Sequence, residues 1–191
     1  LQSSTDCSMK AAANIIAEIL AGLDAAHKAG VVHRDLKPEN VMLLGEPSDQ
    51  GAQLKILDFG VARAAGAGDT RATSLGTRGY MAPEQAGGKV RELGPLVDVY
   101  ALGAILYAAL TGRPPFLADT PAATMVKVVE QVPVSPRKLN ADVPEDLETI
   151  CLRCLQKDPQ LRFSSAGELA DDLDRSLRGE PILSRPLGMG G

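Results

Sequence analysis

An uncharged apolar run from Val99 to Leu110 constrains the fold of this chain more than any other feature. Its 12 residues are too few to cross a bilayer, which takes about 20 apolar residues. We therefore expect a helix from Val97 to Leu110 that is buried in a core and ends at Gly112. Because aromatic residues make up 3% of the chain and Trp is absent, Leu, Ile, Val and Ala must build that core. The 191 residues suit one domain of about 100–200 residues.

Four further helices are expected from apolar periodicity and capping residues. In the first helix, from Met9 to His27, apolar residues recur at four-residue steps, and Gly30 follows as a stop. Three helices are expected downstream. The first has Thr120 as its cap and Pro121 at its first position, and it runs to about Gln131. The second runs from Pro144 to about Gln156, and the third opens with the capping-box spacing of Ser165 and Glu168 and reaches about Arg178. The chain is therefore expected to be mainly α.

One small β-hairpin interrupts the helices. The runs Val41–Leu44 and Leu54–Leu57 have β-type composition, and the segment between them is rich in turn formers. From Asp58 to about Leu96 no periodicity is evident, so that stretch is either wrongly assigned as a loop or functional. The last residues, 179–191, are expected to be a linker or tail.

Composition excludes several classes of protein. With 20 Lys and Arg against 24 Asp and Glu, the net charge is −4, which gives no indication of a nucleic-acid partner. The first ten residues contain no signal-peptide apolar segment. Three cysteines are an odd number, so a disulfide framework is not expected and a cytoplasmic setting is the default. We expect a cytoplasmic globular domain.

The segment HRDLKPEN, residues 33–40, carries the strongest chemical signal. An aspartate five residues before an asparagine, on a loop that leads into a strand, places two oxygen groups around one phosphoryl group. Asp35 can accept a hydroxyl proton, Asn40 can hold Mg²⁺, and Lys37 can neutralise charge on the phosphate. Asp58, at the end of the next strand, adds a second hard-oxygen ligand. The alternative is a polar turn that caps the hairpin.

HRDLKPEN is followed by Asp58-Phe59-Gly60 and then by Ala82-Pro83-Glu84, and this order resembles the eukaryotic-type protein kinases. The segment from Gly179 to Pro186 resembles the linker after the kinase domain in bacterial serine/threonine kinases. The resemblance is to the helical C-terminal lobe of the kinase fold, with no N-terminal lobe. It implies a kinase domain fragment over residues 1–178, with a catalytic loop at 33–40 and an activation segment at 58–84.

The resemblance implies a role for individual residues. Asp35 is similar to the catalytic base, Lys37 to the phosphate-contacting lysine, and Asn40 and Asp58 to the ligands of Mg²⁺. Met42 is expected beneath the adenine of ATP, although it would pack inward in an ordinary core as well. Lys37 and Thr77 resemble the serine/threonine branch, in which Thr77 helps to dock the protein substrate.

Regulation is implied in the same way. Arg34 resembles the arginine of kinases that are switched on by phosphorylation of the activation segment, where a phosphate beside a guanidinium orders the loop. Thr70 and Thr73 are the favoured acceptors ahead of Ser74, and the alternative is that they are ordinary loop hydroxyls.

Some matches are architectural and others are declined. Asp98 is similar to a buried helix aspartate that binds the catalytic-loop backbone, and Glu84 with Arg162 resembles an ion pair that holds the activation segment. Cys151 and Cys154 form a CxxC pattern inside a helix, where we expect core packing and not zinc. Two histidines are expected to have no direct chemical role, His27 at a helix end and His33 as a hydrogen-bonding residue of the loop.

A kinase also needs a glycine-rich loop, a strand lysine and its glutamate partner, and in this family all three precede the HRD motif. Only 32 residues precede His33, and one helix occupies most of them. We therefore expect a kinase whose N-terminal lobe is missing from this chain, which leaves the isolated chain inactive. The alternative is a kinase-like lobe that binds proteins without catalysis. The full-length protein, by resemblance, can continue into a membrane anchor.

Overall fold

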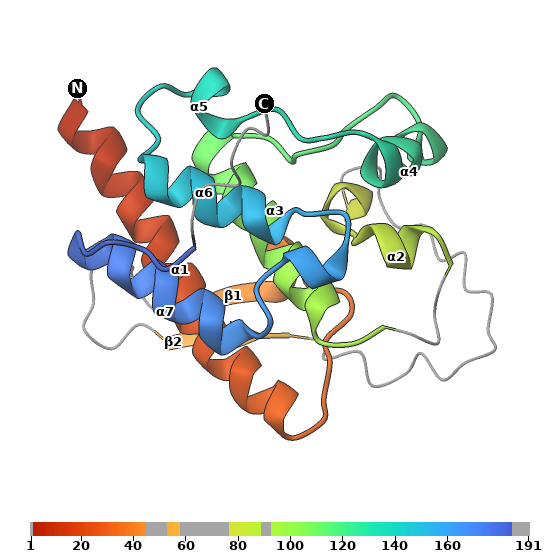
Figure 1. Ribbon diagram of the computed structural model, residues 1–191, viewed down its shortest axis with the longest axis horizontal. Helices are drawn as coiled ribbons and strands as arrows, with labels where there is room; N and C mark the ends of the chain where they lie inside the picture. The colour runs from red at the N-terminus through yellow and green to blue at the C-terminus, as the bar shows by residue number, and fades with distance from the viewer. Residues whose placement is uncertain (1, 45–52, 58–76, 89–92, 185–191) are drawn as a thin grey trace.

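The computed structural model describes residues 2–44, 53–57, 77–88 and 93–184. It is mostly helical with one two-stranded sheet (Figure 1), which confirms the expected fold class. In chain order the elements are α1 (Gln2–Lys28), η1 (Pro38–Asn40), β1 (Val41–Leu44), β2 (Gln53–Ile56), η2 (Thr77–Tyr80), α2 (Pro83–Ala86), α3 (Leu96–Thr111), α4 (Pro121–Glu130), α5 (Pro136–Leu139), α6 (Glu145–Cys154), η4 (Pro159–Leu161) and α7 (Ala166–Arg178), where η marks a 3₁₀ helix.

The apolar run forms α3, the helix that lies in the centre of the molecule (Figure 1). Helices α1 and α6 pack against α3, and α7 packs across α1. Gly103 allows the closest of these approaches, because a Cβ at this position would lie 2.3 Å from Cβ of Cys154 on α6. Gly112 ends α3 with φ +76°, as expected from the sequence.

Helix α1 is longer than its periodicity predicts. It begins at Gln2 and not at Met9, because no glycine or proline before Gly22 interrupts it and the polar residues there are compatible with a helix. It stops where expected. Gly30 has φ +79°, and the N–H of Val31 donates back to the carbonyl of Ala26 (2.9 Å).

The expected hairpin is present. β1 and β2 are antiparallel, with Val41 opposite Ile56 and Leu44 opposite Gln53. The N–H of Leu57 donates to the carbonyl of Asn40 (2.8 Å), so the pairing continues one step beyond the start of β1. The start of β1 and the end of β2 are therefore joined to each other. Helix α1 contacts β2.

The caps of the later helices agree with the sequence in most respects. The hydroxyl of Thr120 accepts the N–H of Ala123, and the hydroxyl of Ser165 accepts the N–H of Glu168. The carboxylate of Glu168 returns to the N–H and hydroxyl of Ser164, one residue earlier than a capping box requires. The one-turn helix α5 was not anticipated, since four residues are too few for a 3.6-residue period.

Cys151 and Cys154 lie in α6 with fully buried side chains, which confirms their assignment to the core. Burial raises the pKa of the Cys154 thiol to about 12 and also raises that of Cys151. Both are therefore thiols and not thiolates at neutral pH, and a thiol is a poor nucleophile and metal ligand.

Two segments outside the large helices are also ordered by contacts. Within the stretch from 58 to 96, the described residues form η2 and α2, short elements without a detectable period. Near the C-terminal end, the N–H groups of Leu183 and Ser184 donate to the two carboxylate oxygens of Asp172 on α7 (2.6 and 2.7 Å).

Among the described helices, none has the length and apolarity to cross a membrane.

Candidate active site

The carboxylate of Asp98, on α3, binds the backbone of the loop that contains the HRDLKPEN segment, residues 33–40. Its Oδ2 accepts the N–H of His33 and the Nε2–H of His27, and its Oδ1 accepts the N–H of Arg34, each at 2.8 Å. The side chain is fully buried, where an ionised carboxylate without such donors would be costly. This arrangement agrees with the sequence-based expectation for Asp98.

The ring of His33 continues the same network. Its Nε2–H donates to the carbonyl of Leu57 (2.8 Å), and its Nδ1 accepts the N–H of Asp35 (3.2 Å). Both contacts are satisfied by the neutral tautomer with the proton on Nε2. His33 is therefore a structural residue, as expected, and it links the end of β2 to the backbone of Asp35.

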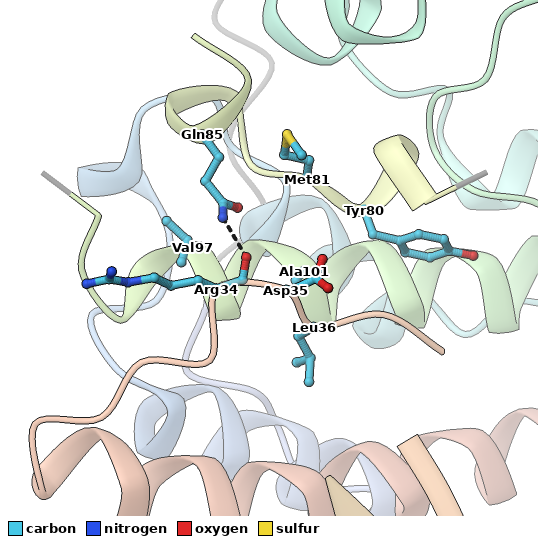
Figure 2. A pocket seen from close by; sticks show the side chains of 8 residues that line it. All are labelled: Arg34, Asp35, Leu36, Tyr80, Met81, Gln85, Val97 and Ala101. Carbon is cyan, nitrogen blue, oxygen red and sulfur yellow. Dashed lines mark hydrogen bonds between the residues drawn. The ribbon is translucent and has the colours of Figure 1, made fainter. Parts of the chain in front are cut away.

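Arg34 has an unusual backbone conformation. Its φ is +67°, and it is the one residue other than glycine with positive φ in the described part of the chain. The left-handed region is sparsely populated by residues that have a Cβ. The side chain extends away from Asp35 (Figure 2), and its buried Nε has no hydrogen-bond partner among the described residues.

Asp35 and Lys37 lie together on the loop. Nζ of Lys37 is 3.3 Å from Oδ2 of Asp35, with 18% of the lysine side chain and 43% of the aspartate side chain exposed. Asp35 lines a small cavity beside Arg34, Tyr80 and Gln85 (Figure 2). A carboxylate that is both partly exposed and held beside an ammonium group can meet a substrate hydroxyl and accept its proton.

Asn40 is buried, with 7% of the residue exposed. Its Nδ2 donates to the carbonyl of Asp35 (2.8 Å), so the amide oxygen is the end that remains to accept a donor or a cation. An amide oxygen is among the ligands that suit Mg²⁺. Asn40 therefore fits a metal ligand, and its neighbour Leu57, which directly precedes Asp58 in the sequence, lies beside it.

The remaining predicted site residues fall into two groups. Met42 lies on β1 with 44% of the residue exposed, and Thr77 begins η2. Asp58, Thr70 and Thr73 lie outside the described residues. The structure thus brings together Arg34, Asp35, Lys37 and Asn40 and places Met42 on the adjoining strand.

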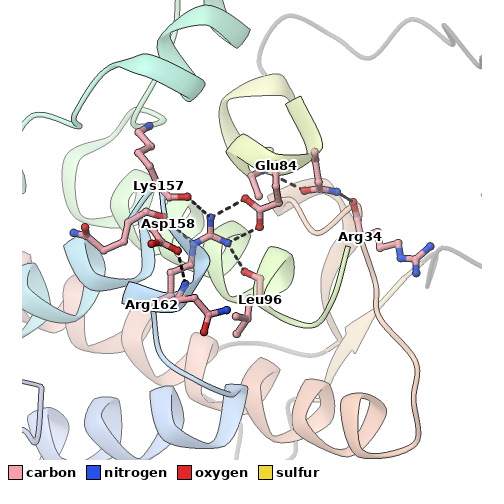
Figure 3. A network of polar contacts seen from close by, with 10 residues as sticks. Arg34, Glu84, Leu96, Lys157, Asp158 and Arg162 are labelled. Carbon is pink, nitrogen blue, oxygen red and sulfur yellow. Dashed lines mark hydrogen bonds and ion pairs between the residues drawn. The ribbon is translucent and has the colours of Figure 1, made fainter. Parts of the chain in front are cut away.

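Arg162 and Glu84 form the expected ion pair (Figure 3). The two guanidinium nitrogens meet the two carboxylate oxygens at 2.7 and 2.8 Å, and the Arg162 side chain is fully buried. The other N–H groups donate to the carbonyls of Gln156, Leu96 and Lys157, so all five donors are used. This pair joins α2 to the segment between α6 and α7.

Two residues of the site were not recognised from the sequence. His27 is at the end of α1, as expected, but its ring also binds Asp98. Gln85 on α2 donates to the carbonyl of Arg34 (2.7 Å). The only sequence signals for them are their positions near motif residues, and neither position reveals a contact across more than 50 residues of chain.

Comparison with known proteins is decisive for the family. The protein kinase domain family matches residues 1–173. The chain belongs to the eukaryotic-type serine/threonine protein kinases of bacteria. A probable serine/threonine-protein kinase of Streptomyces coelicolor is 39% identical over 168 residues, covering 86% of this chain and 24% of that protein. The serine/threonine-protein kinase PknB of Mycolicibacterium smegmatis is 39% identical over 173 residues, covering 88% of this chain and 27% of PknB.

A probable serine/threonine-protein kinase of Clostridium acetobutylicum is 37% identical over 158 residues, covering 82% of this chain and 23% of that protein. This kinase chain therefore spans about a quarter of the length of the curated relatives that it matches. The helical lobe with its small hairpin is consistent with the family.

We predict that Asp98→Asn lowers the free energy of unfolding of this kinase chain by about 3 kcal/mol, because an amide NH₂ would replace one of the oxygens that accept N–H groups. The measurement is urea denaturation followed by circular dichroism. The control is Asp174→Asn on α7, whose side chain is 52% exposed and pairs with Arg178, and we expect a change below about 0.5 kcal/mol there. Equal midpoints for the two variants would contradict the role assigned to Asp98.

Proposed function

We propose that this chain carries the catalytic loop of a protein serine/threonine kinase, which transfers the γ-phosphoryl group of ATP to Ser or Thr hydroxyls of proteins. The observation that carries the proposal is the pairing of Asp35 with Lys37 at 3.3 Å on a loop whose backbone is bound to Asp98. Enzymes that transfer phosphoryl groups depend mainly on such positioning and on electrostatic stabilisation.

Each residue of the loop has a separate task in this proposal. Asp35 orients the substrate hydroxyl and accepts its proton, and its 43% exposed side chain supports that access. Lys37 places a positive charge beside Asp35, where negative charge on the transferred phosphoryl oxygens has to be stabilised. The hydrogen bond from Asn40 to the Asp35 carbonyl holds the loop backbone at Asp35.

Asn40 and Asp58 would hold Mg²⁺, and Met42 would lie beneath the adenine. When bound there, Mg²⁺ would supply positive charge that neutralises the charge developing on the phosphoryl oxygens. The proximity of Leu57 to Asn40 supports a shared site, because Asp58 follows Leu57 directly in the sequence. The exposure of Met42 supports a nucleotide contact at this strand.

The substrate class rests on resemblance and on the relatives, which are named serine/threonine-protein kinases. Thr77, at the start of η2, would take part in docking the protein substrate.

A net charge of −4 gives no reason to add a nucleic acid to the partners. Because the donor is ATP, the proposed reaction places the chain in the cytoplasm, whether or not the full-length protein is anchored in a membrane.

The decisive variant is Asp35→Asn in the complete gene product. We expect its rate of phosphoryl transfer to a Ser- or Thr-containing protein to fall by about 10²–10⁴-fold, because the hydroxyl proton loses its acceptor. Transfer of ³²P from ATP measures the rate, and Asp174→Asn serves as a matched substitution far from the loop. An unchanged rate in Asp35→Asn would refute the proposal and would favour a lobe that binds proteins without catalysis.

The domain division follows from the family. We propose that residues 1–178 form the C-terminal lobe of the kinase domain, that 179–191 form a linker, and that an N-terminal lobe of the same kinase is the partner that completes the nucleotide site. The glycine-rich loop and the strand lysine belong to that lobe in protein kinases. The exposure of Met42 and Val31, 44% each, supports a face that another part of the kinase covers.

The 191-residue chain on its own is therefore expected to transfer phosphate at a negligible rate, since loss of one preorganised electrostatic donor costs about 10²–10³ in rate. The same ³²P assay tests this on the purified chain, with Asp35→Asn as the blank. Robust transfer that disappears in Asp35→Asn would show that no second lobe is required.

Regulation is proposed through Arg34. The Nε of its guanidinium has no hydrogen-bond partner among the described residues, which supports the binding of a phosphate on the activation segment, at Thr70 or Thr73. We expect mass spectrometry of the active gene product to find phosphate on one of them. Loss of both acceptors, or Arg34→Gln, should lower the rate by about 5- to 150-fold, which is the usual range for coupling between sites. Ser74→Ala is the control, and full activity of the unphosphorylated protein would contradict this mode of regulation.

A further inference from the structure

Gln85 connects the short helix α2 to the catalytic loop through both ends of its side-chain amide. Its Oε1 accepts the N–H of Ala82 (3.2 Å), the residue that precedes α2. Its Nε2 donates to the carbonyl of Arg34 (2.7 Å), as Figure 2 shows. The first contact is local, whereas the second spans 51 residues of sequence and reaches the residue just before Asp35.

The carbonyl that Gln85 binds belongs to the one described residue, glycines aside, with positive φ. A residue with a Cβ keeps this conformation only where surrounding contacts over-determine it. For Arg34 those contacts are the Asp98 carboxylate on its N–H (2.8 Å) and Gln85 on its carbonyl. On the same peptide unit as the Arg34 carbonyl, the N–H of Asp35 donates to the ring of His33 (3.2 Å).

The peptide that joins Arg34 to Asp35 is therefore held at both of its polar atoms, at the oxygen by Gln85 and at the N–H by His33. Rotation of this peptide would change the direction in which the Asp35 side chain leaves the backbone. Of the two contacts, the one from His33 comes from the loop itself. The contact from Gln85 connects the peptide to a separate element, α2.

Helix α2 is a firm support for this contact because the residue before Gln85 is itself anchored. Glu84 receives two N–H groups from the fully buried Arg162 at 2.7 and 2.8 Å. Figure 3 shows Glu84 with Arg162 to its left and Arg34 to its right. Neighbouring residues of α2 thus connect the catalytic loop to the segment between α6 and α7.

We propose that Gln85 is a positioning residue for phosphoryl transfer, which fixes the Arg34–Asp35 peptide and so the orientation of the Asp35 carboxylate. The proposal rests on the proposed function of Asp35. Gln85 touches no reacting atom, and its effect passes through the carbonyl of Arg34. A change at Gln85 should therefore alter the rate of the chemical step and leave substrate binding unaffected.

One substitution separates positioning from helix capping. Gln85→Glu keeps the length of the side chain and an oxygen that accepts the N–H of Ala82, but it places a carboxylate oxygen against the Arg34 carbonyl and removes the donor. Gln85→Met removes both contacts. The small cavity lined by Arg34, Asp35 and Gln85 has a volume of about 10 Å³, room for about one water molecule, so a shorter residue could admit solvent that replaces the amide. For this reason the test uses side chains of equal length.

The first measurement is hydrogen exchange of the intact 191-residue chain, resolved at single amides. In Gln85→Glu we expect the amides of Arg34 and Asp35 to exchange about tenfold faster, while those of α3 keep their rates. Gln131→Glu, the same change at an exposed residue after α4, is the control and should match the wild type. Unchanged exchange at Arg34 and Asp35 in Gln85→Glu would overturn the proposal.

The second measurement is steady-state kinetics of the complete gene product. We expect Gln85→Glu and Gln85→Met to lower kcat by about 10- to 100-fold, with KM for ATP and for the protein substrate unchanged within about twofold. Gln131→Glu should keep the wild-type kcat. A wild-type kcat in Gln85→Glu would overturn the proposal. So would a fall in kcat that equals the fall in the folded fraction of the variant, as measured by urea denaturation.

The two proposals can fail separately. If Asp35→Asn is inactive and Gln85→Glu has the wild-type kcat, positioning by Gln85 is wrong and the kinase assignment stands. If Asp35→Asn transfers phosphate at the wild-type rate, the function proposed for Asp35 is wrong, and the catalytic role of Gln85 is wrong with it. In that case hydrogen exchange still reports whether Gln85 holds the Arg34 carbonyl.

Discussion

The loop of residues 33–40 in this kinase chain depends on one buried carboxylate, that of Asp98. A charge inside the apolar helix α3 is stable only because three N–H groups converge on it, two from the loop backbone and one from His27. One of these donors is the N–H of Arg34, whose backbone has the left-handed conformation. Asp35 is the next residue along the chain.

A second buried charge provides the other fixed point. Arg162 uses all five of its N–H donors, two of them on Glu84 and three on backbone carbonyls. Breaking such a pair leaves an uncompensated buried charge, so α2 is held in place. Between Asp98 and Arg162, the loop is bound from α3 on one side and from α2 on the other. The candidate site is thus defined by contacts between segments that are distant in sequence.

Local signals predicted much of the fold. The apolar run of α3, the glycine after it and the cap at Thr120 each depend on a few neighbouring residues, and each prediction is confirmed. The early start of α1 and the one-turn α5 were missed, because neither carries an apolar period. The motif HRDLKPEN predicted which residues meet at the loop, and Asp35, Lys37 and Asn40 do lie together.

The sequence by itself determined the family and the chemical groups of the candidate site, since motif order and residue type do not depend on coordinates. Only the tertiary structure decided how those groups are held. His27 and Gln85 carry no motif of their own, and their partners lie 71 and 51 residues away. The physical reason is that helix and strand periods report which face of an element is buried, whereas a side-chain hydrogen bond between elements depends on how those elements pack.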